Sequence, residues 1–518
     1  MGVPDYEFLL TDAPDAVWSA IGPRYTVVAG ARRREMRVLL DTFDGRLHTA
    51  GLALAYVSRP GGVAGELVLT SPDGVTRQAT VVRWPALVDA VPTGPVTERL
   101  RPVVGVRALL PVARVRSDVG EWRVLNADDK TVLRAYIDRA RTTGTEGTAL
   151  PGRIRLAPVR GYDDHAARVS LMLTEAALAS EATTELDLLL GEDSARLPGR
   201  ATTDMSLHRG RDAATALAAQ LLDLWRTVEI NVPGVVADVD TEFLHDLRVA
   251  VRRTRSLLKL VGDVLPDGAA ARFAPEFRWL GGLTTPMRDL DVLLLDFPDM
   301  LAGLTEADPA DLTPLREHLH LQRAAQRRLL LRGLRSARMA DLATAWRGVL
   351  TPLTRTEPGP SARRRADVGI DIPTLAARCT ARAWRRVAGR ARDVGPDSPS
   401  QLLHDLRKRC KELRYVLEMT TDVCRPEPHR ALLKDLKAVQ DRLGEFQDAE
   451  VHRDAIRGYA TAMLAEQRAG AATLLAMGEL VTRYGSRQRQ AAAEAVTRVG
   501  QLTTKVNRAR ITGLVVPA

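Results

Sequence analysis

The second half of this chain repeats itself at a fixed interval, and this repeat constrains the fold more than any other feature. The stretch LHDLRVAVRRTRSLL begins at Leu244, and LHDLRKRCKELRYVL begins at Leu403. A second pair of blocks, FRWLGGLTTPMRDLDV (277–292) and LKAVQDRLGEFQDAEV (436–451), lies at the same offset of 159 residues. Self-similarity at a constant period is typical of repeated architecture, so the sequence predicts a duplicated unit.

Each copy predicts an amphipathic helix with two adjacent stripes, when residues are placed about 100° apart. One stripe is apolar and suits packing against other helices. It contains Leu244, Leu247, Val251, Thr254, Leu258 and Val261 in the first copy, and Leu403, Leu406, Cys410, Leu413 and Leu417 in the second. The other stripe, which we call the cationic column, contains His245, Arg248, Arg252, Arg255 and Lys259 in the first copy, and His404, Arg407, Lys411 and Arg414 in the second.

A column of like charges is unfavourable by itself, because like-charged neighbours on a helix repel by a few tenths of a kcal/mol. The first column contains no acid that would relieve this repulsion. One cation recurs about every turn, roughly 5.4 Å along the helix, which suits an extended ligand with repeating negative charge. A solvated basic face would explain a single such helix, but two copies with equal spacing favour a binding role. The histidines either donate to phosphate as imidazolium groups or hold the helix starts.

Composition narrows the class of partner. The net charge of +10 favours a polyanion, while the aromatic content of 4% argues against a base-stacking surface, so nucleic acid is an unlikely partner. The three cysteines have no metal-type spacing. The N-terminus does not resemble a secretory signal, and no apolar run approaches membrane-spanning length. These features predict a cytoplasmic protein without a membrane partner or a bound metal.

The hydrophobic period divides the chain into two parts. Residues 1–200 contain short alternating segments separated by turns, which predict an antiparallel, barrel-like β domain. Among its expected strands is TTELDLLL (183–190), and a helix is expected at 165–180. A linker is expected at 191–205, followed by a helical domain at 206–515 with halves at about 206–355 and 365–515. The predicted fold class is therefore α+β multidomain.

The helical blocks resemble the CHAD family, the conserved-histidine α-helical domain. Its pattern of His-x-x-Arg helices and an Arg-Asp-x-Asp-Val segment is matched here by HDLRVAVRRTR, LGGLTTPMRDLDV and HDLRKRCKELRYVLE. The resemblance implies two helical bundles related by pseudo-twofold symmetry and binding of inorganic polyphosphate in a basic groove. It implies that both columns contact the phosphate chain, together with Arg327, Arg335, Arg338, Arg382 and Arg385. Association with polyphosphate granules is a further implication.

The first domain resembles a degenerate CYTH domain, which has the triphosphate tunnel metalloenzyme fold. The resemblance rests on LLDTFDGRLHTAGLALAYV, EWRVLNADDKTVLRAYIDRAR and ELDLLLGED. The family's Glu-x-Glu-x-Lys pattern is replaced by Asp5-Tyr6-Glu7-Phe8-Leu9, and its Arg-x-Arg strand reads Leu54-Ala55-Tyr56-Val57. A tunnel enzyme needs paired carboxylates for a divalent metal and cations for the triphosphate. The remnants of that equipment are Glu7, Glu185, Asp187, Arg114 and Arg116.

The sequence thus predicts a polyphosphate-binding protein with no assigned catalytic residue, metal ligand or cofactor. A metal-dependent triphosphatase of the tunnel type is the first alternative. A scaffold that binds an acidic protein or a nucleic acid is the second. The sequence sets no expectation for the oligomeric state.

Overall fold

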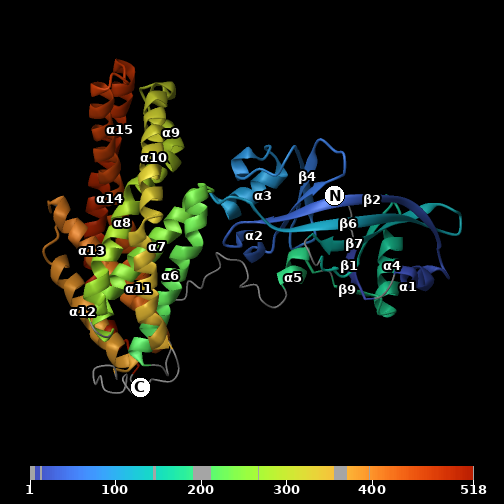
Figure 1. The fold of residues 1–518 in the computed structure, drawn as a ribbon, viewed down its shortest axis with the longest axis horizontal. Coiled ribbons are helices and arrows are strands. Elements are labelled where there is room, and N and C mark those ends of the chain that lie inside the picture. Colours follow the sequence, from blue (N-terminus) through green and yellow to red (C-terminus); the bar gives the residue numbers. More distant parts are fainter. Residues whose placement is uncertain are drawn as a thin grey trace. The chain divides into compact units, whose positions relative to one another are not determined.

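The computed structural model describes residues 6–11, 14–143, 147–181, 183–190, 212–265, 268–354, 370–395 and 397–516. The chain divides into two units, residues 1–201 and 202–518 (Figure 1). The first unit is built on an antiparallel sheet and the second is helical, which confirms the predicted fold class. The expected linker at 191–205 lies outside the described residues. None of the described helices is long and apolar enough to cross a membrane.

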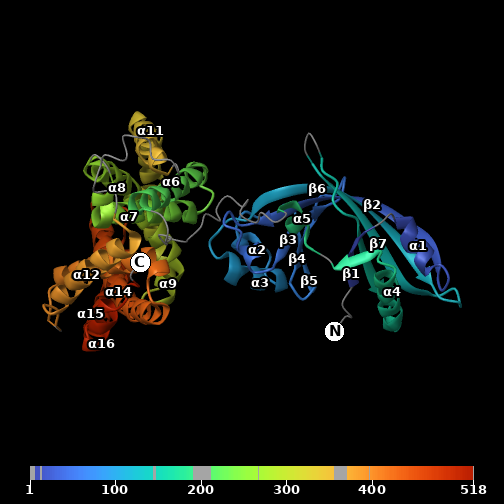
Figure 2. The ribbon, with the colours of Figure 1, turned by 90° about the horizontal axis from the view of Figure 1, so that it is seen from below.

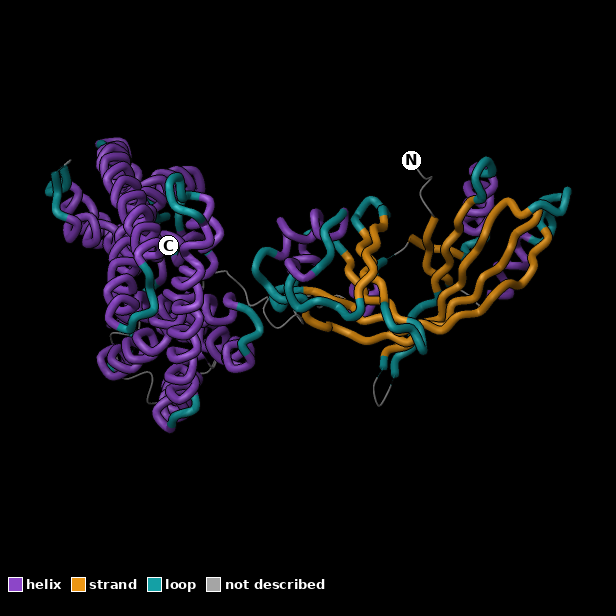
Figure 3. The backbone as a smooth tube through the Cα atoms, turned by 90° about the horizontal axis from the view of Figure 1, so that it is seen from above, coloured by secondary structure: helices purple, strands orange, loops and turns teal. Residues whose placement is uncertain are grey.

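Nine strands form one antiparallel sheet in the first unit, in the order β5-β4-β3-β2-β6-β7-β8-β1-β9. The sheet curls into a half-barrel (Figure 3). Exposed and buried residues alternate along much of β6, as expected for a strand with one face turned inward. The strands are β1 Tyr6–Leu10, β2 Thr26–Asp41, β3 Ala53–Ser58, β4 Gly65–Thr70, β5 Thr76–Val81, β6 Leu110–Leu125, β7 Thr131–Thr142, β8 Arg153–Pro158 and β9 Ala179–Glu181.

Short helices cover separate parts of this sheet (Figure 2). Helices α1 (Pro14–Ile21) and α4 (Asp163–Glu175) contribute Val17 and Val169 to a core with β7 and β8. Helices α2 (Arg46–Thr49) and α3 (Pro95–Val104) contribute to a second core with β3 and β4. Two apolar cores of the curled sheet therefore lie under these pairs of helices, and a third cluster contains Leu39 and Val115.

One predicted strand is wrong. TTELDLLL forms helix α5 (Glu185–Leu190) instead of a strand. The backbone N–H of Asp187 donates to the Thr184 hydroxyl at 3.1 Å, which caps the helix start. Leucine and glutamate also favour helix over strand, because neither is β-branched. The expected helix at 165–180 is confirmed in α4, which ends at Glu175, before the short strand β9.

The second unit consists of α-helices that range from six residues in α9 to 40 residues in α14 (Figure 1). Helices α14 and α15 pack against each other. The helices are α6 Ala213–Ala237, α7 Thr241–Val261, α8 Ala269–Leu295, α9 Phe297–Ala302, α10 Thr313–Leu334, α11 Ala337–Leu350, α12 Ile372–Ala391, α13 Ser400–Met419, α14 Pro426–Ala465, α15 Ala471–Leu502 and α16 Lys505–Thr512.

The duplication is visible in the helix starts. Helices α6 and α12 begin 159 residues apart, as do α7 and α13. Asp212 and Asp371 cap α6 and α12 in the same way, each accepting from a backbone N–H three residues later, at 2.9 and 2.6 Å. These two aspartates also form an antiparallel bridge with each other. A residue that contacts its own equivalent lies close to a twofold axis, so the halves are related by approximate twofold symmetry.

The predicted apolar stripes are confirmed as core positions. Every stripe residue of α7 and of α13 is buried, with Leu247 and Cys410 fully so. The first half adds an aromatic cluster, in which the Phe277 ring lies 6.0 Å from Trp225 and 5.0 Å from Trp346, centroid to centroid. Helix α7 packs on α6 and α8, and α13 packs on α12 and α14.

We expect Phe277→Ala to lower the free energy of unfolding of the helical unit by about 3–5 kcal/mol, because Phe277 is fully buried between two tryptophans. Urea unfolding followed by far-UV circular dichroism, which the helical unit dominates, measures the change. Leu321→Ala, at a leucine that is 53% exposed, is the control and should change stability little. Equal losses in the two variants would contradict the assigned core.

Candidate functional site

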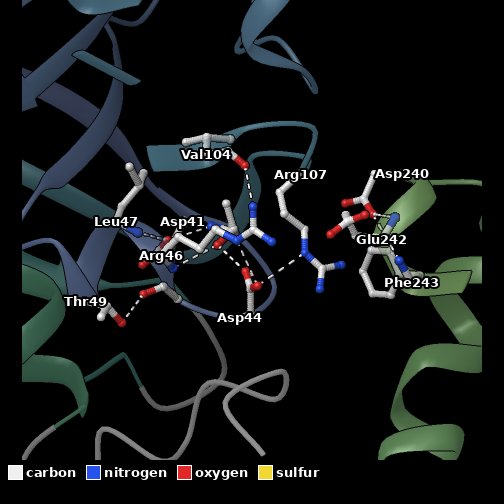
Figure 4. Close-up of polar contacts among 12 residues, drawn as sticks. Asp41, Asp44, Arg46, Leu47, Thr49, Val104, Arg107, Asp240, Glu242 and Phe243 are labelled. Carbon is white, nitrogen blue, oxygen red and sulfur yellow. Dashed lines mark hydrogen bonds and ion pairs between the residues drawn. The ribbon is translucent and has the colours of Figure 1, made fainter. Parts of the chain in front are cut away.

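The first cationic column lies on α7, whose start is held by Asp240. The Asp240 carboxylate accepts hydrogen bonds from the backbone N–H groups of Glu242, at 2.9 Å, and Phe243, at 3.2 Å (Figure 4). Phe243 is buried and closes the first turn against the core. This cap aligns the helix so that its column begins at His245, one turn from the start.

The two columns meet at the contact between the halves. Helices α7 and α13 pack against each other, and the Arg252 Nε donates to the Tyr415 hydroxyl of α13 at 3.0 Å. Arg252 and Lys411 are equivalent residues of the duplication, and the charge of Arg252 acts directly on Lys411. The columns therefore converge near the approximate twofold axis and do not point away from each other.

A pocket of about 620 Å³ opens where the columns converge. Its wall is formed by α7, α8 and α13. Six of its residues are cations and one is an acid. The lining residues are Arg252, Arg255, Ser256, Leu258, Lys259, Ala274, Arg278, Lys408, Lys411, Glu412 and Tyr415. We call this cavity the central pocket.

Burial and neighbouring cations both disfavour the charged form of Lys411 in the central pocket. Burial, together with the charges of Arg407 and Arg252, lowers the pKa of Lys411 from 10.5 to about 8. The charge of Asp448 offsets only part of this effect. Lys411 is therefore partly neutral near physiological pH, and an anion in the pocket would favour its charged form.

Other members of the columns lie off the pocket and bind neighbouring side chains. One Arg248 amino group donates to the hydroxyls of Thr284, at 3.2 Å, and Thr285, at 2.7 Å. Arg407 donates to Gln447 at 2.9 Å, and Arg414 pairs with Glu418 at 2.6 Å. These arginines are positioned by polar groups of their own half.

The two histidines lie in different surroundings although they are equivalent in sequence. His404 Nε2 contacts the Glu450 carboxylate within hydrogen-bonding distance, and the His404 ring lies 5.6 Å from that of Phe446. Asp291, the equivalent of Glu450, binds Arg323 at 2.6 Å instead of His245. Burial and the charge of Arg288 lower the pKa of His245. Neither histidine lines the central pocket.

The five outer arginines that the family resemblance implied are also off the central pocket. Arg327 donates to the Val236 carbonyl at 2.6 Å, and Arg338 pairs with Glu276 at 2.8 Å while lying over the Trp279 ring. Arg335 is exposed at the end of α10. Arg382 is half-buried on α12, and Arg385 lines a separate cavity between α12 and α16.

Several lining residues were not foreseen from the sequence. Lys408 lies three residues before Lys411 and Tyr415 four residues after it, so helical spacing alone could have found both. The face of α13 that lines the pocket is thus turned slightly from the predicted column. Arg278 and Ala274 come from α8, and the sequence analysis recognised the repeated block at 277–292 on that helix without assigning these residues to the ligand site.

The two halves contribute different numbers of cations to the pocket because their sequences have diverged. The residue equivalent to Lys259 is Glu418, which pairs with Arg414, the equivalent of Arg255. Arg255 and Lys259 face the cavity, whereas Arg414 is neutralised on its own helix. More of the cations that line the pocket therefore come from α7 and α8 than from α13.

In the first unit, the acidic remnants of the tunnel pattern are countered by arginine. Arg37 of β2 pairs with Asp138 and, at 3.0 Å, with Glu185, and Arg153 pairs with Glu7 at 2.9 Å. Burial, opposed by the charge of Arg37, leaves the pKa of Glu185 raised. The sequence did not point to Arg37 or Arg153.

The remaining remnants lie elsewhere. Asp187 binds His48 at 2.7 Å. Arg114 and Arg116 are exposed and alternate with the buried Val115, so they lie on the face of the sheet opposite to Val115. No group of three residues able to hold a metal ion occurs in the part of the chain that the structure describes.

The helical unit is a duplicated domain with a cationic pocket between its halves. The family model of the CHAD domain matches residues 216–457, a span that contains both columns and the pocket. The helical unit therefore carries a CHAD domain, as the sequence pattern indicated.

Solved structures resemble both units. The CHAD domain from the plant Ricinus communis is 24% identical, over 61% of this chain and 97% of that chain, with a TM-score of 0.47. PptA from Streptomyces chartreusis is 20% identical, over 56% and 97%, with a TM-score of 0.43. A putative adenylate cyclase from Bacillus halodurans resembles the N-terminal region at 13% identity, over 36% and 97%, with a TM-score of 0.25. No curated protein matches the sequence.

We expect Lys411→Met to raise the free energy of unfolding at pH 7 by about 1 kcal/mol. The folded state disfavours the charged lysine, so the cost is present below the folded pKa of about 8. It disappears as the pH rises towards the ordinary lysine pKa, and the two proteins should become equally stable there. Urea unfolding across this pH range tests the prediction. Lys408→Met, at a side chain that is 67% exposed, is the control, and an equal gain there would contradict it.

Proposed function

We propose that the helical unit binds inorganic polyphosphate in the central pocket. The observation that supports this most is the convergence of cations from both halves on one cavity. Six lysine and arginine side chains share that cavity with a single acid among the described residues. Repulsion among these cations has no structural benefit, and a polyanion would relieve it.

The distances between the cations favour an extended phosphate polymer over a single small anion as the ligand. Arg252 and Lys259 are two turns apart on α7, which corresponds to about 10 Å along the helix axis. Arg278 and Lys408 add cations from α8 and α13. One phosphate group cannot contact all of them, whereas successive phosphates of a linear chain can. Each charge-assisted hydrogen bond contributes about 1.5–3 kcal/mol.

The family resemblance also supports this assignment, because CHAD domains are expected to bind polyphosphate. On this proposal the pocket residues are the core of the site, and the outer arginines extend it. Association with polyphosphate granules would follow from the same affinity. A triphosphatase activity of the first unit has less support, because Arg37 and Arg153 already bind the acids of its sheet.

We expect the triple variant Arg252→Ala, Arg255→Ala, Lys411→Ala to bind polyphosphate about 100-fold or more weakly at low salt, since three phosphate contacts are lost. The plot of log affinity against log salt should also become shallower, by about 0.7 for each lost phosphate contact. Fluorescence polarisation with labelled polyphosphate at several salt concentrations measures both.

The matched control removes the same charge away from both the pocket and the outer arginines, in Arg316→Ala, Arg457→Ala, Arg498→Ala, at exposed positions on α10, α14 and α15. We expect a loss below about threefold, because salt screens distant surface charges. Equal losses in the two triple variants would contradict the assigned site. Displacement of polyphosphate by duplex DNA at equal phosphate concentration would contradict the assigned ligand.

Polyphosphate affinity should fall by up to about tenfold between pH 7 and 9, because Lys411 loses its proton near pH 8 in the free protein. Protonated Lys411 is the binding form, so the sign is a decrease as the pH rises. The same titration of Lys411→Arg should be nearly flat, since arginine stays charged in this range. An unchanged pH profile in Lys411→Arg would show that another group is responsible.

A further inference from the structure

The acid in the central pocket is placed where it opposes the proposed function. Glu412 lies on α13 and is only 7% exposed, although it lines a cavity that is otherwise cationic. An ionised carboxylate repels any anion that enters, so this residue calls for an explanation beyond helix packing.

Glu412 is bound by cations from three helices. It forms an ion pair with Lys259 of α7, which also lines the pocket. Arg409 of α13 contacts it at 3.2 Å, and Arg386 of α12 approaches to 3.5 Å. Burial alone would raise the pKa of Glu412, but the hydrogen bond and charge of Lys259 and the charge of Arg409 lower it, so the carboxylate stays ionised.

Lys259 is accessible despite this pairing. Its side chain is 56% exposed, whereas the Glu412 side chain is 9% exposed. The ammonium group therefore stands between a fixed acid on one side and the open pocket on the other. Lys259 can change partner without any movement of the backbone, because its side chain is long and its outer part is in solvent.

We propose that Glu412 is an internal competitor for the anion: it holds Lys259 in the empty pocket, and a bound phosphate chain must take Lys259 from it. This inference rests on the proposed polyphosphate function. Glu412 thereby lowers the affinity of the pocket for anions. It also determines whether Lys259 can bind an anion that carries few charges. An anion that cannot displace the carboxylate uses the other cations and leaves Lys259 paired.

The test is a double-mutant cycle on Glu412 and Lys259, with polyphosphate as the probe and the full chain as the protein. Glu412→Gln should bind about tenfold more tightly at low salt, because one negative charge beside the ligand is removed. Lys259→Met should weaken binding by less than about threefold in the wild-type background, because Glu412 holds Lys259 there and Arg409 and Arg386 still offset the carboxylate after the substitution. In the Glu412→Gln background the same substitution should weaken binding by about tenfold, since Lys259 is then free to bind phosphate.

The matched control is Glu427→Gln, which removes the same charge from an exposed position at the start of α14 and should leave affinity unchanged. Equal effects of Lys259→Met in both backgrounds would overturn the proposal, as would equal tightening in Glu427→Gln. If Glu412→Gln fails to fold, Lys259→Met in the wild-type background decides alone, because a tenfold loss there would show that Lys259 is already available. If the wild type binds polyphosphate but the two substitutions have independent effects, only the role of Glu412 is overturned. If neither the wild type nor any variant binds polyphosphate, the proposed function itself is overturned.

Discussion

The packing of each column helix against its own half determines where the cations can go. The apolar stripe of α7 packs on α6 and α8, and that of α13 on α12 and α14. The columns lie beside these stripes, so they are left at the contact between the halves. Arg252 and its equivalent Lys411 meet there, and burial, together with repulsion from Arg407 and Arg252, lowers the pKa of Lys411. The hydrophobic effect thus gathers like charges that would separate if they were free.

Helical spacing predicts much of this arrangement, because it depends on period and not on tertiary detail. The apolar stripes and the duplication both follow from the pattern of residues in the sequence. Spacing does not reveal which part of a column faces a cavity. His404 belongs to the column by angle, yet Glu450, 46 residues away in the sequence, binds it outside the pocket. Such partners come from other helices, and only the packed structure brings them together.

The first unit illustrates a different limit of sequence reasoning. Its strands follow from alternating residues, but ELDLLL has both a strand-like run of leucines and a helix cap at Thr184, and the cap decides. The acids Glu7 and Glu185 were recognisable from their positions in the pattern. Their partners Arg153 and Arg37 were not, because each pair joins strands or helices that are distant in the sequence. Glu7 and Glu185 are therefore each paired with an arginine of the same unit.

The residue equivalent to Lys259 in the second half is Glu418, and this difference affects how many ligands the domain can hold. An exactly repeated domain would present two identical half-sites and could hold two ligands at once. Here Glu418 binds Arg414, so, on the proposed function, the described residues of the two halves form one unequal cradle at the central pocket. A polymer whose two ends are chemically alike enters such a cradle equally well in either direction, whereas a polymer with distinct ends would be held in one direction only.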